Sequence, residues 1–140
     1  MRLDHSEALA RVVGADHGVF CTAHPERGTD AVPIVFAIAN ECLAFPIDTV
    51  KPKSSTQLQR MRNLESDPRA TLLVQHWDKN DWSTLWWVRA ELRWIPAPSV
   101  EDVKTLEAKL IAKYEQYLDQ PFVDIHVFRI ERLTGWSAGG

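Results

Sequence analysis

Residues 45–74 read FPIDTVKPKSSTQLQRMRNLESDPRATLLV, and they place a basic loop with hydroxyl groups between a buried strand and the start of a helix. Lys51 and Lys53 supply positive charge. Ser54 and Ser55 supply hydroxyl groups and a candidate N-cap, and the first free backbone N–H groups of the helix point the same way. This loop could therefore bind a phosphate group. The alternative is a solvated lysine loop in which a serine only caps the helix, and local composition alone favours that alternative.

Apolar strand-like runs and amphipathic helices alternate on both sides of this loop. Pro68 ends the helix that follows the loop, because the residue before a proline disfavours helical geometry. Periodicity and turn residues predict three helices. The first spans residues 6–15 with Ser6 as its cap, the second follows the basic loop and contains Leu58, Met61 and Leu64, and the third spans residues 100–118. The same signals predict strands at 18–23, 31–39, 42–47, 70–76, 83–95 and 125–130.

The connections between these strands are mainly short and hairpin-like, for example the tight turn at residues 39–41. Such connections favour an antiparallel sheet, and six strands would most economically close into a small barrel that leaves no exposed edge. The sequence therefore predicts an α+β fold with a six-stranded antiparallel barrel and flanking helices. A chain of 140 residues is expected to form one domain.

Composition limits the classes of partner. A formal net charge of −3 argues against general binding to nucleic acids or to anionic membranes. The sequence has neither an apolar run of about 18 residues nor a cleavable apolar leader, so we expect a cytoplasmic protein. Cys21 and Cys42 lie in apolar runs and are expected to be reduced, buried thiols. Positive charge is concentrated at Lys51, Lys53, Arg60, Arg62 and Arg69, which suits one small anionic ligand or simply a solvated helix face.

Five of the six tryptophans lie between Trp77 and Trp94. Trp86 and Trp87 are neighbours on a predicted strand, so they point to opposite faces and cannot both enter one core. A second subunit or a flat aromatic ligand could cover the outer one, although it could also be half-exposed at a rim. Arg89 shares the face of Trp87, and a tryptophan beside an arginine suits a planar anionic ligand.

Several catalytic classes have no support in the sequence. There is no glycine pattern of the Walker or Rossmann type, and no nucleophile elbow for serine-based catalysis. The five histidines share no spacing typical of metal ligands, so we expect no metal site. If the protein is an enzyme, a bound cofactor is expected to carry the reaction.

Six segments resemble one protein family in their order and spacing. They are VPIVFAI (32–38), LAFPID (43–48), TVKPKSS (49–55), RNLESDPRATLLV (62–74), LWWVRAE (85–91) and FRIERLTGWSA (128–138). They resemble the pyridoxamine 5'-phosphate oxidase-like split-barrel flavoproteins, and most closely the branch of probable oxidoreductases that use the deazaflavin coenzyme F420, and the resemblance extends over nearly the whole chain. The resemblance implies a six-stranded antiparallel split β-barrel of the FMN-binding type.

The resemblance also implies a homodimer with two equivalent cofactor sites at its interface. The loop 49–55 would bind the cofactor phosphate and the end of the preceding strand would lie against the ring system, while one segment of the other subunit and the C-terminal Gly135-Trp136 would complete the site. The residues implied to contact the cofactor are Pro46, Ile47, Asp48, Thr49, Lys51, Lys53, Ser54, Ser55, Trp87, Arg89 and Trp136.

The reaction implied by the resemblance is hydride transfer between F420 and a small organic substrate, and it requires no catalytic acid, base or nucleophile from the protein. FMN is the alternative cofactor, because it presents a phosphate to the same loop. The other class is a non-catalytic protein that binds a flavin, a deazaflavin or a flat tetrapyrrole-like ligand. One departure from the family pattern is Leu92-Arg93, where relatives usually have a glycine, and it affects the substrate side of the site.

Overall fold

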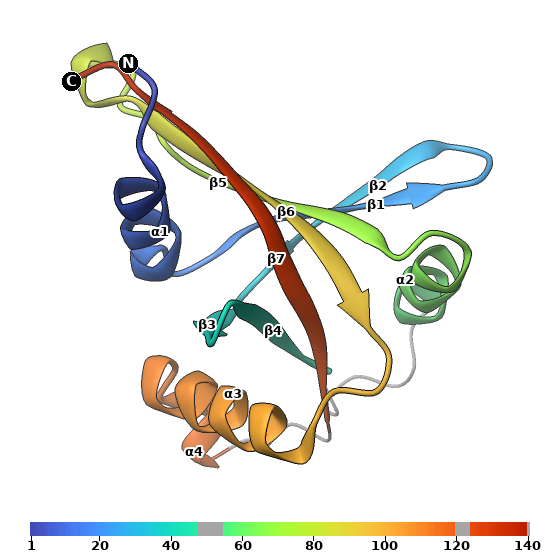
Figure 1. The fold of residues 1–140 in the computed structure, drawn as a ribbon. Helices are drawn as coiled ribbons and strands as arrows, with labels where there is room; N and C mark the ends of the chain where they lie inside the picture. Colours follow the sequence, from blue (N-terminus) through green and yellow to red (C-terminus); the bar gives the residue numbers. More distant parts are fainter. Residues whose placement is uncertain (48–54, 120–123, 140) are drawn as a thin grey trace.

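The computed structural model describes residues 1–47, 55–119 and 124–139 (Figure 1). Asp48, Thr49, Lys51, Lys53 and Ser54 lie outside the described residues, so their predicted roles stay predictions. The elements are α1 (His5–Gly14), β1 (Gly18–His24), β2 (Gly28–Ile34), β3 (Ala37–Ala39), β4 (Cys42–Ile47), α2 (Ser55–Ser66), β5 (Arg69–His76), a 3-10 turn η1 (Trp82–Thr84), β6 (Trp86–Ile95), α3 (Val100–Lys113), α4 (Gln116–Asp119) and β7 (Asp124–Ser137).

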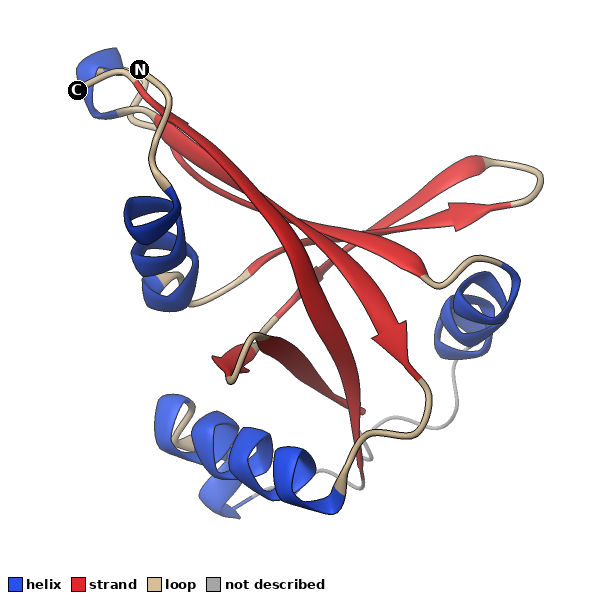
Figure 2. Cartoon of the chain, in the orientation of Figure 1, coloured by secondary structure: helices blue, strands red, loops and turns tan. Residues whose placement is uncertain are grey.

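The strands of the described chain form one antiparallel sheet in the order β2-β1-β5-β6-β7-β4-β3. The predicted α+β class and antiparallel pairing are confirmed. The predicted count of six strands is wrong, because the expected strand 31–39 is split into β2 and β3, which lie at the two ends of the strand order. The sheet therefore does not close into a barrel. Figure 2 shows its helices at the periphery of the strongly twisted sheet.

The split between β2 and β3 has a physical cause at Phe36. Its side chain is fully buried, and its carbonyl oxygen accepts hydrogen bonds from the Tyr114 hydroxyl at 2.9 Å and from Lys113 Nζ at 3.0 Å. These backbone bonds go to the end of α3 instead of a neighbouring strand, so the ladder is interrupted there. α3 ends at Lys113, and Tyr114 is its C-cap with extended backbone, which corrects the single helix predicted to reach residue 118.

β6 and β7 form the longest antiparallel ladder of the sheet, and β7 continues to Ser137 rather than ending at the predicted residue 130. A register shift between Glu91 and Leu92 accommodates the extra residue Glu131. Such a bulge lets pairing continue beyond residue 130, where the predicted strand ends. β6 begins at Trp86 and not at the predicted residue 83, because Asp81 caps the preceding 3-10 turn.

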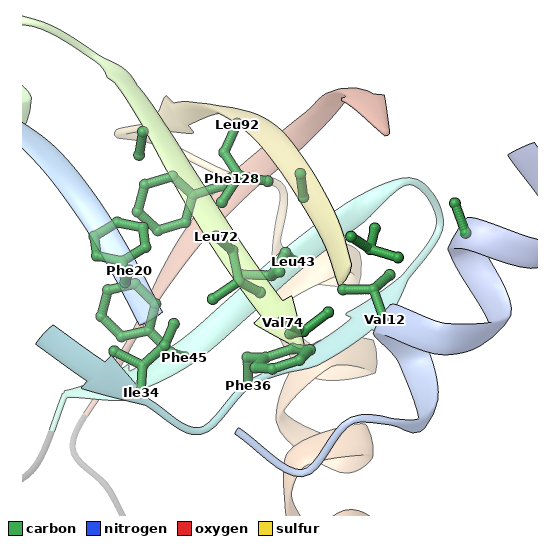
Figure 3. Packing of buried hydrophobic residues seen from close by; sticks show 14 of the residues in the cluster. Val12, Phe20, Ile34, Phe36, Leu43, Phe45, Leu72, Val74, Leu92 and Phe128 are labelled. Atoms are coloured by element: carbon green, nitrogen blue, oxygen red, sulfur yellow. The ribbon is translucent and has the colours of Figure 1, made fainter. Parts of the chain in front are cut away.

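The main core lies on the inner face of the sheet (Figure 3). Phe20 contacts the rings of Phe45 and Phe128 in edge-on geometry, with centroids 4.9 and 5.2 Å apart. A second buried cluster lies under α3, where Leu106 and Leu110 pack against β4 and β7. Aromatic pairs of this kind add to the stabilisation from apolar burial.

The structure also tests the local predictions made for two helix termini and one turn. The predicted end of α2 before Pro68 is confirmed, since α2 ends at Ser66. The predicted cap Ser6 is wrong, because Asp4 is the N-cap of α1 and accepts a hydrogen bond from the Glu7 N–H at 2.8 Å. The tight turn is confirmed at Asn40 and Glu41, whose φ angles are 52° and 64°. No helix within the described residues is both long and apolar enough to cross a bilayer.

Candidate functional site

Trp87 and Trp136 form the centre of the outer face of the sheet. They are direct partners across the β6-β7 ladder, and Gln75 of β5 is the partner of Trp87 on its other side. The Arg89 guanidinium lies 5.6 Å from the centroid of the Trp87 ring, within cation–π distance. The structure therefore brings together the three predicted residues Trp87, Arg89 and Trp136 on one surface.

This surface contains an unsatisfied polar atom. Thr134 faces Arg89 across the ladder, and its hydroxyl oxygen is buried without a hydrogen-bond partner among the described residues. A buried hydroxyl without a partner is unfavourable, and this oxygen is enclosed by the protein. Trp136 is 37% exposed, and Arg89 is exposed beside it. The outer face is thus apolar at its centre and incompletely covered.

Trp86 lies on the other side of the sheet. It packs against the main core, and the Arg11 guanidinium of α1 lies 5.1 Å from its ring. The prediction that Trp86 and Trp87 point to opposite faces is therefore confirmed. The covering of the Trp87 face by a second subunit stays a prediction.

The end of β4 carries the second group of predicted residues. Pro46 pairs with Ile125 of β7, Ile47 pairs with Asp124, and both proline and isoleucine are half-buried. Ile47 also lines a cavity of about 330 Å³, together with Met61, Trp94 and other mainly apolar residues. Of the predicted phosphate loop, only the backbone of Ser55 at the start of α2 is described.

The aromatic group around Trp136 and the group around Pro46 lie at opposite ends of β7. Ile125, the partner of Pro46, and Trp136 are eleven residues apart on the same strand. At a rise of about 3.3 Å per residue, this separation is roughly 35 Å. Figure 1 shows β7 running from the region of α3 to the two chain termini. One chain therefore cannot bring Trp136 and Pro46 to the same small ligand.

Two residues near the end of β4 were not predicted as site residues. Arg60 of α2 lies with its guanidinium 5.1 Å from the Phe45 ring centroid, and burial lowers the pKa of Arg60. The His126 ring lies tilted against the Phe45 ring, with a centroid distance of 5.0 Å. Burial, followed by the charge of Arg60, lowers the pKa of His126 to about 4, so the imidazole is neutral at pH 7.

A sequence signal for Arg60 does exist. Arg60 precedes the buried Leu64 by four residues, and residues four apart share one helix face. Helical periodicity could thus have placed Arg60 inward, whereas charge alone assigned it to a solvated face. No comparable local signal marks His126.

A buried polar network connects α2 to the β1-β2 hairpin. The Asn63 side-chain amide is fully buried and donates hydrogen bonds to Thr22 Oγ1 at 3.0 Å and to Asp30 Oδ2 at 2.8 Å. Gln59 Nε2 donates to Asn63 Oδ1 at 2.8 Å. This network fixes the position of α2, and therefore of Arg60, relative to the sheet.

Comparisons with known protein structures identify the fold class. No protein-family model matches the chain, and no curated protein matches its sequence. An FAD-binding protein from Mesorhizobium loti is 15% identical, with a TM-score of 0.71 over 96% of this chain and 93% of its own. A candidate pyridoxamine 5'-phosphate oxidase from Corynebacterium glutamicum is 14% identical, with a TM-score of 0.60 over 98% of both chains.

A heme-binding protein from Mycobacterium smegmatis is 14% identical, with a TM-score of 0.66 over 94% of this chain and 57% of its own. These structures share the pyridoxamine 5'-phosphate oxidase-like split-barrel architecture. The chain therefore has the split-barrel fold of that class of proteins, as the sequence motifs indicated. Identities at this level establish the fold and no particular activity.

Proposed function

We propose that this protein is an F420-dependent oxidoreductase that works as a homodimer, with each cofactor site built from two chains. The observation that carries the proposal is the separation of roughly 35 Å along β7 between the Pro46 end and the Trp136 end. A site that uses both ends must take one from each subunit. A two-fold axis through the outer sheet face would bring each end of β7 near the opposite end of its partner.

The residues present fit a flat, anionic cofactor. Trp87 and Trp136 offer adjoining aromatic rings, and Arg89 offers a planar cation beside them. In the partner chain, Pro46, Ile47 and the basic loop 49–55 would hold the ring edge and the phosphate.

F420, when bound, supplies a deazaflavin ring that exchanges a hydride with a stacked substrate. The protein's own residues bind and orient this ring and exclude water from its face. The aromatic pair would limit the ring to one plane, and the charges at Arg89, Lys51 and Lys53 would fix its anionic groups. The protein itself then needs to supply no general acid or base.

The second candidate is a protein that binds FMN, or that carries a flat cofactor without catalysis. The observations that favour it are the neighbours described as FAD-binding and heme-binding proteins. FMN would present its phosphate to the same loop. A heme would use the same aromatic surface. His126 is the buried histidine beside the end of β4, but its ring packs on Phe45 and is therefore not free to bind the heme iron.

Parallel titrations of the purified protein with F420, FMN and heme distinguish these candidates. We expect F420 to bind with about one molecule per chain to a dimer seen by light scattering, followed by turnover with an artificial acceptor. Tight binding of FMN alone would support the FMN enzyme, and binding without turnover would support the carrier. A stable monomer that binds cofactor fully would contradict the two-chain site.

A further inference from the structure

The first three residues of the chain lie along the last residues of β7. The Leu3 N–H donates to the Gly135 carbonyl oxygen at 2.9 Å, and the Ser137 N–H donates to the Met1 carbonyl oxygen at 2.9 Å. β6 pairs with the other edge of β7 at this level. Residues 1–3 therefore add one short strand to the sheet beside β7.

The packing of Leu3 sets the direction of the Arg2 side chain. Leu3 packs against the main core, and a Cβ atom on Gly135 would lie only 2.9 Å from Leu3 Cδ1, so the glycine leaves the space that Leu3 fills. Neighbouring residues of an extended chain point to opposite faces, which turns Arg2 to the outer face. The pairing agrees, because Arg2 forms an antiparallel bridge with Trp136 and such partners share a face.

Arg2, Trp136 and Trp87 thus form one row across three neighbouring strands. Arg89 lies two residues beyond Trp87 on β6. With strands about 4.8 Å apart and a rise of about 3.4 Å per residue, the Cα atoms of Arg2 and Arg89 are about 12 Å apart. The two cations therefore lie on opposite sides of the tryptophan pair, at a spacing comparable with the long dimension of three fused rings.

Both arginines are available to a ligand. They are exposed, and neither forms an ion pair with a carboxylate whose side chain the structure describes. Two acidic residues further along β6 and β7 have other partners: Glu91 pairs with Arg132 at 3.8 Å, and Glu131 pairs with Arg93 at 3.3 Å. The surface around the tryptophan pair therefore favours a flat ligand with oxygen acceptors at its two ends.

We propose that Arg2 is a further ligand of the planar cofactor and contacts the end of the ring system opposite to the end that Arg89 contacts. The identity of the ligand rests on the proposed function, and Arg2 would come from the same subunit as Trp136. The shared chemistry is an oxygen that accepts from a guanidinium. It can come from the pyrimidine carbonyl groups, which F420 and FMN have in common, or from the acidic ring hydroxyl of F420, where FMN carries a methyl group.

A contact with the ring hydroxyl would let the protein select F420. The ionised hydroxyl carries negative charge, and a nearby guanidinium stabilises that form. A methyl group at the same place gains nothing from a cation. At this end of the ring, Arg2 would therefore favour F420 over FMN and lower the pKa of the bound hydroxyl.

The test compares Arg2→Met with Lys109→Met, which removes one positive charge from an exposed position on α3. Calorimetry measures the affinities for F420 and FMN. An absorbance titration of bound F420 measures the pKa of its hydroxyl, because the spectrum changes when the hydroxyl ionises. We expect Arg2→Met to weaken F420 binding by about tenfold or more, since one charge-assisted contact is lost. Lys109→Met should change each affinity less than twofold.

The pattern identifies the end of the ring that Arg2 contacts. A loss confined to F420, with a rise in the pKa of its bound hydroxyl, assigns Arg2 to the hydroxyl. Equal losses for F420 and FMN, with an unchanged pKa, assign Arg2 to the pyrimidine end. Unchanged affinities of Arg2→Met for both cofactors would overturn the proposal.

Measurements on the ligand-free protein separate a ligand contact from a structural role. Because the Arg2 side chain is exposed, Arg2→Met should keep the melting temperature and the dimer fraction of the wild-type protein. A loss of affinity accompanied by a clear fall in melting temperature, or by dissociation of the dimer, would overturn the proposal. Arg2 would then act on the fold or on the subunit contact.

Failure of the proposed function remains distinguishable. If the wild-type protein binds neither F420 nor FMN, the proposed oxidoreductase is wrong, and the surface is tested with pyrene-1-carboxylate and the neutral pyrene-1-methanol. Weaker binding of the carboxylate to Arg2→Met than to the wild-type protein, with equal binding of the alcohol, would support a cation beside a planar-ring site. Equal binding of the carboxylate to both proteins would overturn it.

Discussion

Trp87 and Trp136 lie directly opposite each other on β6 and β7, while Trp86, the neighbour of Trp87, packs into the core on the other side of the sheet. The outer pair therefore presents two large rings that the chain's own core does not use. Apolar surface of this kind on one face of a sheet is typical of a contact surface. The predictions below follow from this arrangement and from the polar groups around Phe45.

Replacement of Trp87 by glutamate should convert the proposed dimer to a monomer. A charge at the centre of an apolar interface is costly to desolvate, whereas the core side of β6 is unchanged. Light scattering at micromolar concentration measures the dimer fraction. Leu118→Glu is the matched control, because Leu118 is 70% exposed on α4, away from this face. A dimer that persists in Trp87→Glu would place the interface elsewhere.

Replacement of Arg89 by lysine should weaken cofactor binding while the dimer persists. Lysine keeps the charge but loses the planar fork that stacks over Trp87 and binds an oxyanion with two bonds. Calorimetry and light scattering on the same sample measure affinity and dimer fraction. Intact affinity in a dissociated dimer would instead show that Arg89 is a purely structural residue.

The stability of the protein should fall as the pH decreases from about 6.5 to about 4. His126 has its pKa lowered to about 4 in the folded protein, so the unfolded chain binds the proton first as the pH falls. His126 is 8% exposed, and a shift of this size corresponds to roughly 3 kcal/mol lost across that window. Denaturant unfolding at several pH values should show this slope, and His126→Gln should flatten it. An equal slope in both proteins would assign the effect to other groups.

Replacement of Asn63 by alanine should destabilise the protein by about 2–4 kcal/mol. The change removes two buried donors, leaves Thr22 and Asp30 with one partner fewer, and creates a small cavity. Urea unfolding measures the loss, and Arg62→Ala on the exposed side of α2 is the control. A loss below 0.5 kcal/mol, roughly the scatter of exposed substitutions, would mean that the network does not hold α2 in place.

The sequence predicts the elements of this fold better than their boundaries. Apolar periodicity located α1, α2 and most strands, and Pro68 marked the end of α2 because its effect on the backbone is local. The break at Phe36 depends on Tyr114 and Lys113, which are more than 70 residues away. Local patterns cannot show such contacts, and the same is true of the bulge that extends β7.

In the candidate site, too, local patterns predicted some features, whereas contacts between distant segments determine the others. The alternation of strand residues correctly placed Trp87 and Arg89 on one face and Trp86 on the other. The half-buried Arg60 and the buried His126 are placed by how α2 and β7 pack on Phe45, which local sequence patterns do not show. Charge in a run of basic residues therefore did not distinguish Arg60 from the exposed Arg62 or from Arg69, which is paired with Asp67.

The central claim is that each site combines the loop 49–55 of one chain with the Trp136 end of the other. We expect Lys51→Ala/Lys53→Ala to lose about 1.5–3 kcal/mol of cofactor binding for each charge-assisted contact, with little change in the melting temperature of the ligand-free protein. Arg89→Ala/Trp136→Ala should also bind weakly. Each parent homodimer then carries two damaged sites.

The most direct measurement is cofactor binding by a heterodimer of these two double variants, co-expressed with different affinity tags and purified through both. In a site shared between chains, one site of the heterodimer carries both lesions and the other carries neither. We predict one site per heterodimer with the affinity of the wild-type protein. A heterodimer whose two sites both stay as weak as those of the parents would contradict the shared site.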